Sequence, residues 1–122
     1  MKILGIDYGT KRIGLAWADT TLGVVLPFGI VKTIPSLSKL IQEEKVDKIV
    51  LGFPIGLNGK ENANTERVKA AGFEIQKATD ITVEYFDERF SSQAADAAGG
   101  GVSRDERSAM IILEGYLERR KK

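Results

Sequence analysis

The sequence predicts an α/β fold: a five-stranded mixed sheet in the spatial order 3-2-1-4-5, with helices on both faces. Three strand-like apolar runs come first and are separated by loops too short for a crossover, so they form an antiparallel meander. Helix-like and strand-like patterns then alternate, which is typical of parallel strands. Right-handed crossovers place the fourth strand beside the first and the fifth beside the fourth. The 122 residues are of a common size for one domain, and we expect a single domain over 1–122.

The first strand is predicted over residues 2–7, which are almost continuously apolar, as in a strand buried on both faces. Residues 12–18 and 24–32 form the second and third strands. Pro27 cannot donate a hydrogen bond to a neighbouring strand, so the third strand should lie at a sheet edge. The first strand is therefore the innermost of the three.

The rest of the chain alternates between helical spacing and short apolar runs. In order, we predict a helix from 35 to about 45, a strand at 48–53, a helix at 63–79, a strand at 81–87, a short helix at 91–98 and a last helix at 103–120. The fourth strand is apolar throughout and should be central. In such a sheet, ligands bind outside the carboxyl ends of the strands, at the point beside the first strand where the strand order reverses.

The composition excludes several kinds of chemistry. The chain has no cysteine and no histidine, so thiolate nucleophiles, disulfides, Cys-ligated zinc and imidazole bases are all ruled out. Carboxylates are the remaining metal ligands, and their oxygens suit hard cations such as Mg²⁺ or Mn²⁺. No apolar run approaches the roughly 20 residues of a membrane helix, so we expect a cytoplasmic protein. The net charge of +1 means that any nucleic-acid contact must rest on a local basic patch.

Asp7 ends the first predicted strand, at the point where the strand order reverses, and Gly9 follows in a short turn. A carboxylate where a buried strand reaches the surface can hold a metal ion, and a nearby glycine lets a phosphate approach the backbone closely. The alternative is that Asp7 and Gly9 only form a hairpin turn, since both are common turn residues. The position in the sheet favours a functional role.

Asp105 is the second candidate carboxylate. Ser103 and Glu106 have the spacing of a capping box, which sets the start of the last helix. Asp105 heads the apolar stripe of that helix, which continues through Ala109, Ile112, Leu113, Tyr116 and Leu117. It could simply complement the helix dipole. Its place on the stripe turns it toward the sheet, however, and a half-buried carboxylate needs a cation or hydrogen-bond donors to stay charged.

Asp87, Glu88 and Arg89 end the fifth strand, at the same edge of the sheet as Asp7. The strand between them puts the two backbones roughly 10 Å apart, so direct contact is not expected. A glutamate reaching inward and a bridge of metal ions could span the gap. The alternative is a polar strand end with a local Glu–Arg pair. If the acids converge, divalent ions would offset their repulsion, and two Mg²⁺ ions could activate water and stabilise a leaving oxygen without any histidine.

Four motifs, taken together, resemble the YqgF (RuvX) family of RNase H-like proteins, and they span nearly the whole chain. They are Gly5-Ile6-Asp7-Tyr8-Gly9-Thr10-Lys11-Arg12-Ile13-Gly14; Val50-Leu51-Gly52-Phe53-Pro54 with Asn58-Gly59; Asp87-Glu88-Arg89-Phe90-Ser91-Ser92; and Asp105 with Ser108-Ala109-Met110-Ile111-Ile112-Leu113-Glu114-Gly115-Tyr116-Leu117. The family is linked to maturation of the small-subunit ribosomal RNA precursor and is related to the RuvC Holliday-junction resolvases.

The resemblance implies an RNase H-like fold and a metal-dependent nuclease site built from Asp7, Glu88 and Asp105. The expected cofactor is Mg²⁺ or Mn²⁺, and the expected substrate is structured RNA or branched DNA. The related resolvases carry a further acid on the fourth strand, whereas this strand ends in Gly52-Phe53-Pro54. Whether Asp87 is a ligand or supports one is open.

Basic residues cluster near the same motifs. Gly9, Thr10, Lys11 and Arg12 are the expected first contacts to phosphate groups, and we expect Lys60, Arg67, Arg89 and Arg104 to line the same edge. Contacts to phosphates position a nucleic acid without reading its sequence. Residues 119–122 form a basic end to the chain that we expect to be a solvated, disordered tail.

Two other functions fit part of the sequence. The segment from Gly5 to Thr10 also resembles the phosphate loop of actin-like ATPases and sugar kinases, although that architecture places the nucleotide between two such domains. A nucleic-acid-binding module with little catalysis is the third hypothesis. Exposed strand edges also suggest a weak homodimer.

Overall fold

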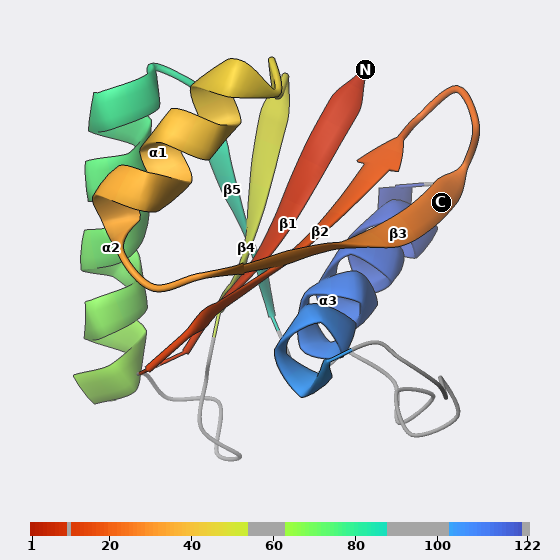
Figure 1. Ribbon diagram of the computed structural model, residues 1–122. Coiled ribbons are helices and arrows are strands. Elements are labelled where there is room, and N and C mark those ends of the chain that lie inside the picture. Colours follow the sequence, from red (N-terminus) through yellow and green to blue (C-terminus); the bar gives the residue numbers. More distant parts are fainter. Residues whose placement is uncertain (10, 54–62, 88–102, 121–122) are drawn as a thin grey trace.

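A computed structural model describes residues 1–9, 11–53, 63–87 and 103–120. Within these ranges the elements are, in chain order, β1 (Lys2–Tyr8), β2 (Ile13–Asp19), β3 (Val24–Val31), α1 (Ile34–Glu43), β4 (Lys48–Phe53), α2 (Ala63–Thr79), β5 (Val83–Asp87) and α3 (Arg104–Arg120) (Figure 1). The short helix predicted at 91–98 lies outside the described residues. In the described part of the chain, no helix has the length and apolar character needed to cross a lipid bilayer.

The strands form one sheet in the order β3-β2-β1-β4-β5, as the sequence predicts. β1 pairs antiparallel with β2 and parallel with β4, and β5 continues the sheet parallel to β4. β3 lies at the edge, where Pro27 disturbs pairing least. β1 is thus the central strand, and the strand order reverses direction beside it.

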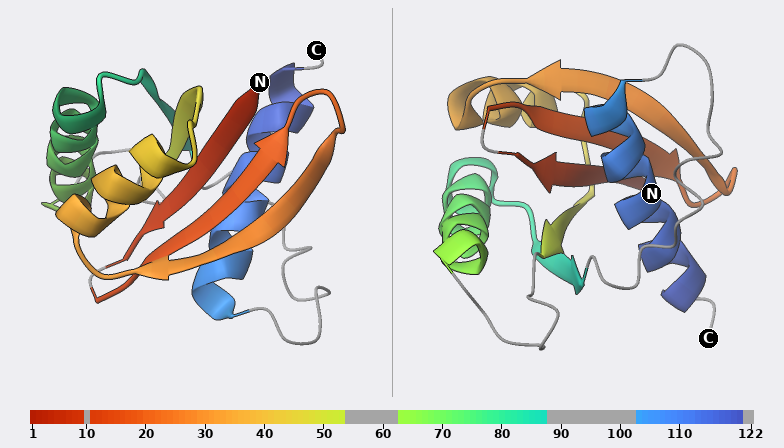
Figure 2. Two further views of the ribbon diagram at one scale, coloured as in Figure 1. Left: turned by 45° about the horizontal axis from the view of Figure 1, so that its top comes forward. Right: turned by 90° about the horizontal axis from the view of Figure 1, so that it is seen from below.

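Helices cover both faces of the sheet, with α1 and α2 on one side and α3 on the other (Figures 1 and 2). Each layer encloses its own core, and β1 contributes to both. Leu4 and Ile6 pack with α1 and α2, whereas Ile3 packs with α3, and all three side chains are fully buried. This alternation, with a period of two residues, determines which side chains at the end of β1 face α3.

Several element ends differ from the sequence prediction by one or two residues, and two of these shifts have a clear local cause. β5 begins at Val83 and not at residue 81, because the chain leaves α2 through Asp80, whose φ is 60°, and the amide of Ile81 donates to the Thr79 hydroxyl at 3.3 Å. α1 begins at Ile34, because the Thr33 hydroxyl caps it by accepting from the backbone amide of Ser36. Neither shift changes the strand order.

The start of α3 has the predicted capping box. The Ser103 hydroxyl accepts from the Glu106 amide at 3.2 Å, and the Glu106 carboxylate accepts from the Ser103 amide at 3.4 Å. At its other end α3 continues through Arg120, which confirms the predicted end of the helix at about 120. Residues 119 and 120 are therefore helical and not part of a disordered tail, and the rest of the predicted tail, 121–122, lies outside the described residues. The helix is anchored near this end by Tyr116, which is 8% exposed.

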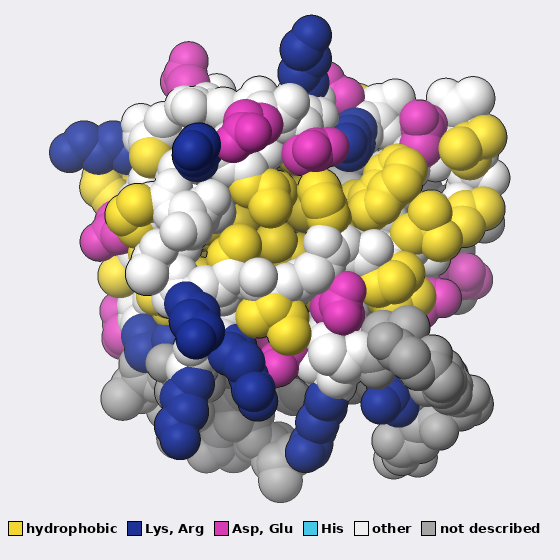
Figure 3. Space-filling model, viewed as in Figure 1, with side chains coloured by type: hydrophobic (Ala, Val, Ile, Leu, Met, Phe, Trp, Pro, Cys, Tyr) yellow, Lys and Arg dark blue, Asp and Glu magenta, His cyan; other side chains and the backbone are white. Residues whose placement is uncertain are grey.

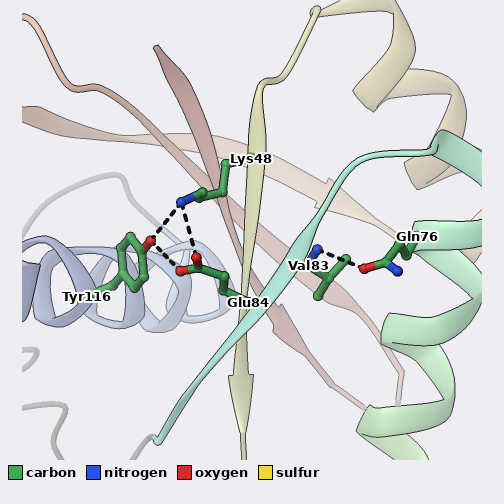
Figure 4. Close-up of polar contacts among 5 residues, drawn as sticks. All are labelled: Lys48, Gln76, Val83, Glu84 and Tyr116. Atoms are coloured by element: carbon green, nitrogen blue, oxygen red, sulfur yellow. Dashed lines mark hydrogen bonds and ion pairs between the residues drawn. The ribbon is translucent and has the colours of Figure 1, made fainter.

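Tyr116 belongs to a polar cluster at the edge of the sheet where β4 and β5 begin (Figure 4). Its hydroxyl donates to the Glu84 carboxylate, and the Lys48 ammonium lies 3.1 Å from Glu84 and 3.4 Å from the Tyr116 hydroxyl. Beside it, the backbone amide of Val83 donates to the Gln76 side chain at 3.2 Å. The cluster ties α3 to β4 and β5 at the end of the sheet remote from Asp7.

This cluster predicts a loss of stability in alkaline solution. Burial, and then the hydrogen bond to Glu84, raise the pKa of Tyr116 above its ordinary 10.0. The hydrogen bonds that the Lys48 ammonium donates to Glu84 and to the Tyr116 hydroxyl raise the pKa of Lys48 above 10.5. Both groups hold their protons more tightly in the folded state than in the unfolded state. Their contribution to the free energy of unfolding is therefore complete below about pH 10, and it is lost as the pH rises through their raised pKa values. Urea unfolding from about pH 8 to pH 11 should show this fall, and Tyr116→Phe should make it shallower. If the free energy of unfolding fell with pH as steeply in Tyr116→Phe as in wild type, Tyr116 would not be a source of the alkaline loss of stability.

Candidate active site

Asp7 lies near the carboxyl end of β1 and on the face that α3 covers. Ile3 and Gly5 of the same strand both contact α3, and Asp7 follows them at the same two-residue spacing. In the antiparallel pairing with β2, Asp7 stands directly opposite Gly14. Opposite residues of such a pair project from the same face, so the missing side chain of Gly14 leaves space beside Asp7.

Asp105 fills that space. A Cβ atom on Gly14 would collide with the backbone carbonyl oxygen of Asp105 and would lie 2.9 Å from the Asp105 Cβ. Because opposite Cβ atoms in a sheet are roughly 5 Å apart, the Cβ atoms of Asp7 and Asp105 lie within about 8 Å of each other. The Asp105 side chain is 26% exposed, in agreement with its predicted orientation toward the sheet. The two carboxylates thus share one partly buried corner of the sheet.

A second glycine lets α3 come this close. A Cβ atom on Gly5 would lie 2.9 Å from the Cβ of Leu113 and 3.1 Å from the carbonyl oxygen of Ala109, which is closer than packed atoms normally approach. α3 therefore rests directly on the backbones of β1 and β2. The position of Asp105 is set by main-chain packing along the helix and does not depend on its own side chain.

The turn after β1 is compact. The amide of Gly9 donates to the carbonyl of Asp7 at 3.1 Å, and a Cβ atom on Gly9 would collide with the carbonyl oxygen of Arg12. The turn's own packing therefore requires a glycine at position 9. Approach of a phosphate to this glycine stays a prediction.

Arg67 of α2 holds this turn from the other side. Its guanidinium donates to the carbonyl of Tyr8 at 2.9 Å and to that of Gly9 at 3.4 Å, and it lies 4.7 Å from the centre of the Tyr8 ring. We predicted Arg67 only as one of several residues along a basic edge. Its contact with the turn depends on how α2 packs beside β1, and no spacing in the sequence indicates it.

Arg12 forms an ion pair with Asp105. Its Nε lies 3.0 Å from Oδ2 of Asp105, and its side chain is 60% exposed. An ion pair this exposed contributes about 0–1 kcal/mol to stability.

The predicted phosphate contacts Lys11 and Arg104 are both exposed. Figure 3 shows Lys and Arg side chains gathered along the lower rim of the molecule, the edge at which β1 ends.

Three predicted site residues, Thr10, Glu88 and Arg89, lie outside the described residues. β5 ends at Asp87, which pairs with Phe53 at the carboxyl ends of the parallel strands, the same end of the sheet as Asp7. Within the described ranges, no group of three or more acidic, histidine or cysteine side chains could hold a metal ion. Asp7 and Asp105 carry carboxylate oxygens, the kind of ligand that Mg²⁺ and Mn²⁺ prefer, and Asp105 already pairs with one cation, the Arg12 guanidinium.

The fold is that of the resolvase RuvC. Over 99% of this chain and 96% of the other, it superimposes on Thermus thermophilus RuvC in complex with a Holliday junction substrate, with a TM-score of 0.73 and 12% sequence identity. A second Thermus thermophilus RuvC structure gives a TM-score of 0.67 with 14% identity over the same shares of the two chains. The chain thus has an RNase H-like fold, and Asp7 and Asp105 lie where the strand order of that fold reverses.

Comparison of sequences identifies the family. The model of the RuvX family, described as Holliday junction resolvase, matches residues 1–119. A protein of Agathobacter rectalis named "Putative pre-16S rRNA nuclease" is 36% identical, covering 97% of this chain and 95% of its own length; one of Maridesulfovibrio salexigens with the same name is 34% identical, covering 98% and 99%. The chain belongs to the RuvX family, as the motifs indicate, and is a nuclease, a hydrolase of ester bonds in nucleic acid.

Proposed function

We propose that this chain is a metal-dependent nuclease that hydrolyses phosphodiester bonds during maturation of the 5′ end of the 16S ribosomal RNA precursor in the cytoplasm. The observation that carries the proposal is the packing of Asp105 onto Gly14, which brings it beside Asp7 at the carboxyl edge of the sheet. The RNA substrate is supported by the name of the relatives, which match over nearly their whole length.

In this proposal Asp7, Asp105 and Glu88 are the ligands of Mg²⁺ or Mn²⁺. When bound, such ions supply an activated water and stabilise the leaving oxygen of a phosphodiester. Asp7 and Asp105 hold fixed negative charge at the point of reaction, and Arg67 keeps the turn after Asp7 in place. The residues proposed to contact backbone phosphates are Gly9, Thr10, Lys11, Arg12, Arg89 and Arg104. One RNase H-like domain, residues 1–122, would carry the whole site.

A second candidate is endonuclease action on branched DNA. It is favoured by the description of the family model, which names Holliday junction resolvase. Phosphate contacts alone do not distinguish RNA from DNA, so both substrates fit the basic edge. A weak homodimer through the exposed strand edge stays a prediction.

The test offers both substrates to the purified protein. A 16S precursor fragment with its 5′ extension and a four-way DNA junction are each incubated with Mg²⁺, Mn²⁺ or EDTA, and the products are mapped. We expect cleavage of the RNA within its extension when a metal ion is present and none in EDTA. Cleavage of the junction alone would favour the second candidate. RNA binding in EDTA without turnover of either substrate would leave a binding module as the better account.

A further inference from the structure

The ion pair between Arg12 and Asp105 joins a residue proposed to bind phosphate to a residue proposed to bind metal. The two partners differ in how firmly they are held. Asp105 is fixed through its backbone, which packs against Gly14, and its side chain is 26% exposed. The Arg12 side chain is 60% exposed and contacts the carboxylate through Nε. The guanidinium can therefore leave while the carboxylate stays where it is.

A divalent ion and this guanidinium would compete for the same carboxylate. Oδ2 of Asp105 lies 3.0 Å from Nε of Arg12, and a metal ion at this carboxylate would lie within a few ångströms of the positive guanidinium. Like charges at such a distance repel even in water. The ion pair is exposed and contributes little to stability, so separating Arg12 from Asp105 costs little free energy. Binding a metal ion while the guanidinium stays in place would cost more, because the two positive charges repel.

We propose that Arg12 is an exchangeable counter-ion of Asp105: it neutralises the carboxylate before metal binds and is released by the metal ion to contact a phosphate group of the substrate. This inference rests on the proposed metal site. It assigns Arg12 two successive partners, and an arginine suits both, since its planar donors match carboxylate and phosphate oxygens alike. Metal binding would in this way prepare a phosphate contact at the edge of the site.

The opposite hypothesis is that Arg12 orients Asp105 so that it can bind metal. The two hypotheses predict opposite changes in metal affinity when the arginine is removed. Orientation by Arg12 is the weaker explanation, because the packing of α3 on Gly5 and Gly14 already positions Asp105 and the contact made by Arg12 is exposed.

Calorimetric titration of Mn²⁺ into the RNA-free protein decides between them. In Arg12→Gln we expect the dissociation constant for Mn²⁺ to fall about three- to tenfold, the size expected for loss of one like charge a few ångströms away. Arg12→Lys, which keeps the charge, should stay within about twofold of wild type. Lys11→Gln is the matched control: it removes a positive charge from the neighbouring exposed residue and should also change affinity less than about twofold.

The titration separates the failure of this inference from that of the proposed function. If wild type binds Mn²⁺ through Asp105, as shown by weaker binding in Asp105→Asn, but Arg12→Gln binds no tighter, the exchange is wrong and the metal site stands. If wild type and Asp105→Asn bind Mn²⁺ equally, or not at all, the metal site and the exchange are both wrong. Thermal unfolding of each variant confirms that the protein titrated is folded.

Discussion

In the Asp7→Asn variant, we expect metal-dependent cleavage of the RNA substrate to fall about 100-fold or more while the fold is retained. Asparagine keeps the shape of the side chain but removes the charge that would hold a divalent ion. Changing groups that only orient a metal ligand already costs about 10- to 100-fold, so loss of a ligand should cost at least as much. Stability should change little, because asparagine has nearly the same size and shape as aspartate and keeps one side-chain oxygen that can accept a hydrogen bond. Initial rates over a series of Mg²⁺ concentrations, with thermal unfolding alongside, measure both effects.

Asp80→Asn is the matched control for this loss. Asp80 follows α2 and leads into the start of β5, at the opposite edge of the sheet from Asp7. Its φ of 60° lies in the left-handed region, which asparagine adopts readily. We expect this variant to cleave at the wild-type rate. Equal rates in wild type and Asp7→Asn would refute the role of Asp7.

The Gly14→Ala variant should lose both stability and activity. The added methyl group would collide with the carbonyl of Asp105, so the first turn of α3 would have to move away from β2. Overpacking of this kind costs about 1–3 kcal/mol, a sizeable part of the stability of a small domain. The same shift carries Asp105 away from Asp7. We expect a lower unfolding midpoint in urea and a reduced turnover rate per folded molecule.

Gly5→Ala separates these two effects. Its added methyl group would also press on α3, but against Leu113 and Ala109, which lie further along the helix than Asp105. We expect Gly5→Ala to lose about as much stability as Gly14→Ala, but to lose less of its turnover rate per folded molecule. If Gly14→Ala reduced turnover no more than Gly5→Ala at equal folded fraction, the close packing of Asp105 on Gly14 would not be needed for catalysis.

The sheet order could be predicted because it follows from local patterns and the handedness of connections. Short loops forced β1, β2 and β3 into a meander, and helical connections placed β4 and β5 on the other side of β1. The start of α3 was readable for the same reason, since the capping box of Ser103 and Glu106 is a contact between near neighbours. Features that depend on a few adjacent residues are visible in the sequence.

Contacts between distant residues were not visible. The ion pair of Arg12 with Asp105 and the bonds from Arg67 to the turn depend on the distances at which α3 and α2 pack on the sheet. Those distances depend on which glycines face a helix. Nothing in the sequence distinguishes Gly14 from any other glycine in a strand, and only the structure shows that Asp105 packs against it. The sequence therefore indicated which residues carry charge at the site but not how they hold one another.

The most direct test of the central claim is a crystal structure of the protein with bound Mn²⁺, whose anomalous scattering locates the ion. We predict Mn²⁺ at coordination distance, roughly 2.1 Å, from carboxylate oxygens of both Asp7 and Asp105, with no such ion in Asp105→Asn. The same map would show whether Glu88 or Asp87 completes the site. Full occupancy of Mn²⁺ elsewhere on the protein, with both carboxylates free of metal, would contradict the account.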